Sequence, residues 1–104
     1  MLEISTAKIV RVIFLAREYG PDSSQVKDYI ASLNYDEKSS LVALLWVGRE
    51  TYGPHEFDMA KQIAEVEGTA PTEHYLAGNP ELPEYLETGM DYLGVDVVGV
   101  ENVM

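Results

Sequence analysis

Leu41-Val42-Ala43-Leu44-Leu45-Trp46-Val47 is the longest apolar run in the sequence, and it decides the fold. A run of this length fits either a buried strand or a buried helix. Leucine and alanine outnumber β-branched residues in it, and Asp36 and Glu37 stand where negative charge stabilises the first turn of a helix. Because a helix that is apolar on every side is buried on every side, the run predicts a central helix over about 36–48.

Amphipathic patterns on both sides of this run predict the surrounding helices. Apolar residues recur at three- and four-residue spacing in five further segments, at about 6–19, 24–33, 54–67, 71–76 and 81–93. In the first segment Val10 and Phe14 widen the apolar stripe, which predicts burial on two sides. Asn34 fits two roles, the left-handed end of one helix or the N-cap of the next. The pattern predicts an all-α bundle of five or six helices.

The last ten residues have a different character. Valines alternate loosely with polar residues over 95–104, which suits a short strand or an extended tail. Leu2 and Ile4 show a similar alternation, so the two ends are candidates for pairing, within one chain or between two. The helical part covers about 5–94, and no linker or repeat divides the chain. We therefore expect one domain over 1–104.

The charge balance excludes some partners. The formal net charge is −11, and the basic residues are scattered, which disfavours nucleic acid and anionic membrane surfaces. Residues 54–104 carry Lys61 as their only basic side chain against eleven acidic ones. This acidic half is either a solvated surface or a docking surface for a basic partner.

The chain contains no cysteine, so disulfides, thiolate nucleophiles and cysteine-based zinc sites are excluded. No stretch reaches the ~20 apolar residues of a membrane span. The first residues lack the basic start and apolar run of a signal peptide. We therefore expect a cytoplasmic protein without a membrane segment.

Catalytic motifs are incomplete wherever they begin. His55-Glu56-Phe57-Asp58-Met59 starts like a zinc-protease helix, but methionine stands where the second histidine is required. Phosphate-binding, dinucleotide-binding and nucleophile-elbow motifs are missing. His55, Asp58 and His74 are the residues that could converge as metal ligands. We assign no catalytic residue, metal or cofactor, and we expect a protein that is not an enzyme.

One group of residues matches the composition of a binding site. Trp46, Arg49, Tyr52 and His55 gather around the predicted end of the central helix, and aromatic residues beside an arginine are enriched at interface hot spots. Arg49 could also bind a carboxylate ligand, cap the helix, or pair with an acid of the sixth helix. The full set of ligand or partner candidates is Trp46, Arg49, Tyr52, His55, His74 and Tyr75.

The central segment also carries a family resemblance. Leu33-Asn34-x-Asp36-Glu37, followed by Leu41-Val42-Ala43-Leu44-x-Trp46-x-Gly48-Arg49, resembles a bacterial family catalogued as domain of unknown function 3775. Tyr75-Leu76-x-Gly78-x-Pro80-x-Leu82 and Tyr85-Leu86-Glu87-x-Gly89 are similar to the second half of that family. The resemblance covers about 29–94. It implies a compact helical domain of bacterial origin, with no activity, substrate or cofactor attached.

The chain departs from the family pattern at one position. Glycine often follows the arginine in that family, and Glu50 stands there in this sequence, so the geometry of the turn is left open. For function we expect a small acidic, non-catalytic interaction or regulatory module with a protein partner, and a homodimer stays open. The alternative is a protein that binds a small molecule or a metal through the Trp46, Arg49 and His55 region.

Overall fold

The computed structural model describes residues 2–67 and 71–95, and these residues form helices without any strand. The elements are α1 (Thr6–Tyr19), α2 (Ser24–Ala31), α3 (Tyr35–Gly48), the 3₁₀ turn η1 (Pro54–Glu56), α4 (Phe57–Glu67), α5 (Thr72–Ala77) and α6 (Leu82–Tyr92). The all-α prediction is confirmed. Residues 2–5 and Val95 are not in a strand, and the rest of the predicted tail, 96–104, lies outside the described residues, as does Gly68, directly after the helix predicted over 54–67.

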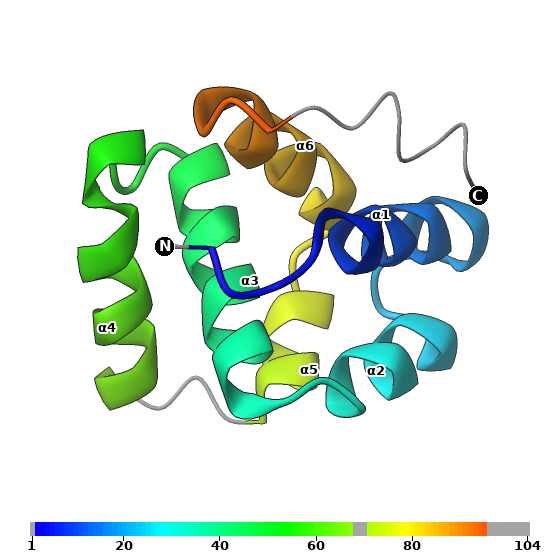
Figure 1. Ribbon diagram of the computed structural model, residues 1–104. Helices are drawn as coiled ribbons and strands as arrows, with labels where there is room; N and C mark the ends of the chain where they lie inside the picture. The colour runs from blue at the N-terminus through cyan, green and yellow to red at the C-terminus, as the bar shows by residue number, and fades with distance from the viewer. Residues whose placement is uncertain (1, 68–70, 96–104) are drawn as a thin grey trace.

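Helix α3 is the centre of the molecule, as its apolar run predicts. Every residue from Leu41 to Gly48 is buried. Figure 1 shows α4 on one side of α3, with α1 and α2 on the other and α5 and α6 packed along its length. One continuous core joins apolar side chains from all six α-helices.

Helices α3 and α6 approach each other so closely that only glycine fits at two positions. A Cβ added to Gly48 would lie 1.8 Å from the carbonyl oxygen of Tyr85, and a Cβ added to Gly89 would lie 2.5 Å from the carbonyl oxygen of Leu44. The two glycines therefore let the backbones meet, and they fix α6 against the C-terminal half of α3.

Side-chain caps set where the helices begin. Ser5 accepts a hydrogen bond from the backbone N–H of Lys8 at the start of α1, and Ser23 serves α2 in the same way. Asn34 takes the second of its two predicted roles. Its side chain accepts from the backbone N–H of Glu37, and the Glu37 carboxylate accepts from the N–H of Asn34, which completes a capping box for α3.

The amphipathic pattern of the first helix overestimated burial at one position. Phe14 is 47% exposed, so the prediction that a second side of α1 is covered is only half correct: Val10 is buried and Phe14 is not. Met59 and Val66 on α4 are exposed as well. Helix α4 packs on α3 through the face that carries its buried residues, and Met59 and Val66 are not among them. None of the helices in the described residues is both long and apolar enough to cross a membrane.

Candidate functional site

The aromatic residues predicted to gather at the end of α3 do so. The indole N–H of Trp46 donates a hydrogen bond of 2.8 Å to the hydroxyl of Tyr75, which comes from α5. The ring of Tyr52 packs on Trp46 at a centroid distance of 5.7 Å. Because Trp46 is only 7% exposed, little of its ring is accessible to a ligand. The two contacts serve instead to hold the ring of Tyr52 in place.

Helices α3 and α6 end side by side with the same backbone hydrogen bonds. At α3 the N–H of Glu50 bonds to the carbonyl of Val47, and the N–H of Thr51 bonds to that of Trp46. At α6 the corresponding bonds run from Gly94 to Asp91 and from Val95 to Met90. Both are Schellman motifs, in which the residue after the C-cap adopts a left-handed conformation.

Glu50 occupies the left-handed position of α3 with φ of 67°, and it is the only described residue other than glycine with positive φ. Gly94 occupies the equivalent position of α6 with φ of 74°. The turn therefore has the geometry that glycine favours even though glutamate stands there, which answers the question left open by the family pattern.

An open hollow of about 280 Å³ lies between these two helix ends. We call it the α3–α6 hollow, and its lining residues are Val47, Glu50, Tyr52, Gly53, Pro54 and Tyr92. The hydroxyl of Tyr92 donates a hydrogen bond of 3.0 Å to Oε2 of Glu50, which joins the two helix ends across it. This bond and the nearby carboxylate charge raise the pKa of Tyr92.

A second hollow of about 300 Å³ lies on the other side of Pro54. His55 and Asp58 line it together with apolar side chains from both ends of the described chain, namely Leu2, Phe57, Leu93 and Val95. The predicted candidate His55 therefore lies next to the α3–α6 hollow without lining it.

Neither Arg49 nor His74 lines one of these two hollows. Arg49 is the exposed C-cap residue of α3, and its Nε donates to the hydroxyl of Thr51 at 3.2 Å. No ion pair joins Arg49 to an acid of α6 within residues 2–67 and 71–95. His74 is exposed on α5. His55, Asp58 and His74 form no ligand set, since no three His, Asp or Glu side chains in the described part of the chain are placed to hold a metal.

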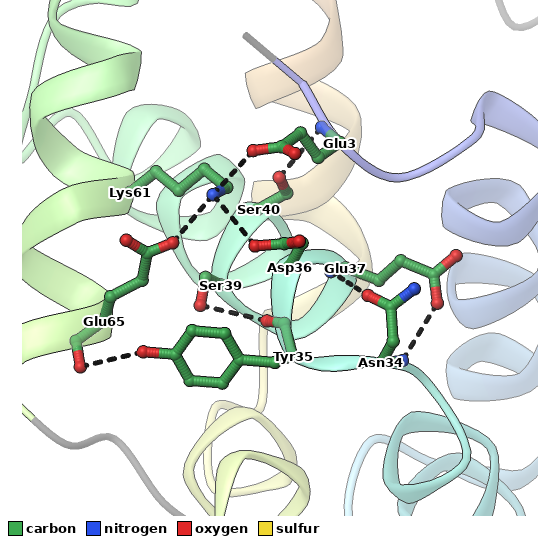
Figure 2. Close-up of polar contacts among 9 residues, drawn as sticks. All are labelled: Glu3, Asn34, Tyr35, Asp36, Glu37, Ser39, Ser40, Lys61 and Glu65. Carbon is green, nitrogen blue, oxygen red and sulfur yellow. Dashed lines mark hydrogen bonds and ion pairs between the residues drawn. The ribbon is translucent and has the colours of Figure 1, made fainter.

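A cluster of charged residues around Lys61 was not predicted at all. The ammonium of Lys61 lies 2.7 Å from Glu3, 2.8 Å from Glu65 and 3.6 Å from Asp36, and Lys61 is only 8% exposed. Figure 2 shows the three carboxylates converging on Nζ from the N-terminal segment, α3 and α4. Lys61 donates hydrogen bonds to the carboxylates of Glu3 and Glu65, and these bonds outweigh the effect of burial and raise the pKa of Lys61.

The Lys61 cluster holds the N-terminal segment on the bundle. The backbone N–H of Glu3 donates to the hydroxyl of Ser40, a residue that is fully buried on α3, and Ile4 is buried beside it. Because Lys61 stays protonated among carboxylates, it is an anchor rather than a nucleophile or a base. The only signal in the sequence is the spacing of Lys61 and Glu65, which places them one helical turn apart.

The acidic face of α6 is partly engaged by α1. The guanidinium of Arg17 donates two hydrogen bonds of 2.7 Å to the carboxylate of Glu87, and it lies 4.0 Å from Glu84. The bidentate contact lowers the pKa of Glu87. Glu87 therefore stays charged in a fixed ion pair with Arg17, which does not suit a general acid.

The fold and the two hollows define the class of protein. It is a small all-α domain built on a central buried helix, with acidic and tyrosine side chains lining hollows near the C-terminal ends of α3 and α6. Comparison with protein families then matches residues 23–95 to the family described as "Protein of unknown function (DUF3775)". The match covers most of the chain, and the protein belongs to this family. Comparison with curated proteins and with solved structures gives no match.

The residues that carry the family resemblance stabilise this fold. Asn34 and Glu37 form the capping box of α3, Trp46 bonds to Tyr75, and Gly48 and Gly89 allow the α3–α6 contact. These motif residues build the bundle and position the hollow. Glu50, which departs from the family pattern, is the one that presents a charge in it.

Proposed function

We propose that this protein is a non-catalytic interaction module that binds a basic protein partner in the bacterial cytoplasm. The observation that carries the proposal is the placement of Lys61. It is the only lysine or arginine after Arg49, and it is buried among three carboxylates. Residues 50–67 and 71–95 therefore present acidic side chains to solvent with no exposed lysine or arginine among them. Such a surface attracts a basic partner and accelerates its association.

The ionisable groups support a binding role rather than a catalytic one. The pKa values of Glu3, Glu37 and Glu87 are lowered by their cationic partners, and those of Lys8 and Lys61 are raised by their carboxylates. A general acid or base works best with a pKa near the operating pH. Each of these shifts moves the pKa of the group further from pH 7, so the group keeps its charge, which suits fixed charges at a surface.

The net charge also bears on self-association. Two copies that each carry −11 repel one another, so a basic partner of a different kind is favoured over a homodimer. Sedimentation equilibrium at low and high salt tests this part of the proposal, and the expected result is a monomer at both salt concentrations. A tight dimer at low salt would contradict this part of the proposal and indicate that the partner is a second copy of the chain.

A titration with a fluorescent lysine decamer tests the proposal, with a glutamate decamer as the negative probe. One variant neutralises three exposed acids of the α6 region, Glu81→Gln, Glu84→Gln and Asp91→Asn. A matched variant of equal net charge neutralises three exposed acids of the first half, Glu18→Gln, Asp22→Asn and Asp28→Asn. We expect salt-sensitive binding that the first variant weakens about tenfold and the second weakens far less. Equal effects, or no binding of the lysine decamer, would contradict the proposal.

A further inference from the structure

We propose that the α3–α6 hollow is the specific point of that interaction, and that it receives an arginine side chain of the basic partner. This inference rests on the proposed function and adds the residue that is recognised and the atoms that recognise it. The guanidinium would pair with the carboxylate of Glu50 and lie against the rings of Tyr52 and Tyr92, which line the same hollow.

The electrostatics of the hollow favour a cation from three directions. Helices α3 and α6 both end there, as Figure 1 shows near the top of the bundle, so the negative ends of two helix dipoles point to the same place. The Glu50 carboxylate adds a full negative charge. The faces of the two tyrosine rings are negative as well, and they favour a planar cation that can stack on them.

The hollow is already arranged for such a ligand. Tyr92 holds Oε2 of Glu50, and among the described residues no hydrogen-bond donor engages Oε1. Tyr52 is held against Trp46, whose indole N–H is in turn fixed by Tyr75. A side chain entering the hollow therefore meets groups whose positions are set by the fold, and little ordering is needed on binding.

The backbone at Glu50 is an independent observation that points the same way. The position has the left-handed conformation that glycine adopts without strain, and its counterpart on α6 is a glycine. The chain instead keeps a charged side chain there and directs it into the hollow. Strained residues of this kind concentrate at ligand-binding positions.

The chemistry selects arginine over other cations. A guanidinium can donate to Oε1 while its plane stacks on tyrosine, whereas an ammonium is a compact, strongly hydrated charge. The hollow is open to solvent, which fits the end of a side chain that projects from a larger partner. A polyamine or a free metal ion would not use the aromatic walls in the same way.

Nuclear magnetic resonance titration of the ¹⁵N-labelled full chain tests the inference. The probe is the peptide acetyl-Gly-Arg-Gly-Arg-Gly-amide, with its lysine and citrulline counterparts as comparison probes. We expect the arginine peptide to shift the amide signals of Glu50, Thr51 and Tyr92, the lysine peptide to bind more weakly, and the neutral citrulline peptide to cause no shift. Shifts confined to other parts of the acidic surface would overturn the inference.

A pair of variants separates this inference from the proposed function. Glu50→Gln keeps the shape of the side chain and its acceptor for Tyr92, and it removes the charge. Glu67→Gln removes one charge from an exposed position at the end of α4. We expect about a tenfold loss of affinity for the arginine peptide with Glu50→Gln and less than about twofold with Glu67→Gln. If the lysine decamer binds but the two variants behave alike, the inference fails and the proposed function stands. If the lysine decamer does not bind at all, both fail.

Discussion

The ends of α3 and α6 are built alike and differ in one residue. Both close with the same pair of backbone hydrogen bonds, and both place the next residue at positive φ. At α6 that residue is Gly94, whose added Cβ would meet nothing within 4 Å. At α3 it is Glu50, whose carboxylate is bonded to Tyr92. The comparison separates what the backbone requires from what the side chain contributes.

The largest expected effect comes from breaking the contact that places the two ends side by side. Gly48→Ala puts a methyl group inside the backbone of α6, so we expect the free energy of unfolding to fall by about 3 kcal/mol. Urea denaturation measures it. Gly78→Ala is the matched control, because its Cβ would meet only ordinary contacts at 3.5 Å, and it should change stability by less than about 0.5 kcal/mol. Equal effects of the two substitutions on stability would show that α3 and α6 can move apart at little cost in free energy.

The next effect isolates the backbone requirement at the α6 end. Gly94→Ala adds a side chain at positive φ with no steric contact, so the cost is conformational and amounts to about 1–2 kcal/mol. Thermal and urea unfolding should agree on this value. A neutral result would mean that the turn relaxes to another conformation, and the two helix ends would then not be equivalent.

The opposite end of α3 provides a comparison by pH. Hydrogen bonds from Lys8 and from the N–H of Asn34 lower the pKa of Glu37 below its usual 4.5. The folded state then binds fewer protons than the unfolded chain. The ionised Glu37 carboxylate therefore stabilises the fold above about pH 4.5, and this contribution is lost as the pH falls through the pKa of Glu37 in the folded state. Glu37→Gln should cost about 1 kcal/mol at pH 7 and flatten the acid limb of the stability curve. An unchanged acid limb would assign that limb to other carboxylates.

The smallest effect on stability is expected where the effect on binding is largest. Glu50→Gly removes the strain at positive φ but also removes the Tyr92 bond and adds freedom to the unfolded chain, so stability should change by less than about 1 kcal/mol. The same substitution should abolish the response to the arginine peptide. A loss of stability beyond about 2 kcal/mol would instead make Glu50 a structural residue.

The sequence predicts the elements well because they depend on neighbours along the chain. The apolar run predicts α3, and the residues around Asn34 predict the start of that helix, although its capping box had to be seen to choose between the two roles of Asn34. The contact of Trp46 with Tyr52 is also visible in outline, since both lie near one helix end, whereas the bond from Trp46 to Tyr75 is not.

The rest depends on which helices lie together. Lys61 meets Glu3 and Asp36 only because α4 and the N-terminal segment pack on α3, and no spacing in the sequence encodes that. The α3–α6 hollow exists because the two helices end on the same side of the molecule. In the sequence Glu50 differs from other residues only as a departure from the family pattern, and its left-handed conformation gives that departure a physical meaning.

The N-terminal segment and α1 have a consequence for how the protein is divided. The family match begins at residue 23, yet Ile4, Ile9, Val12, Ile13 and Ala16 belong to the same core as α3 and α6. Arg17 also anchors α1 to Glu87 of α6, and Glu3 anchors the N-terminal segment to Lys61 of α4. A fragment cut at the family boundary would uncover one side of α6 and leave Lys61 short of one of its three carboxylates. The unit recognised by comparing sequences is therefore smaller than the unit that packs as one core.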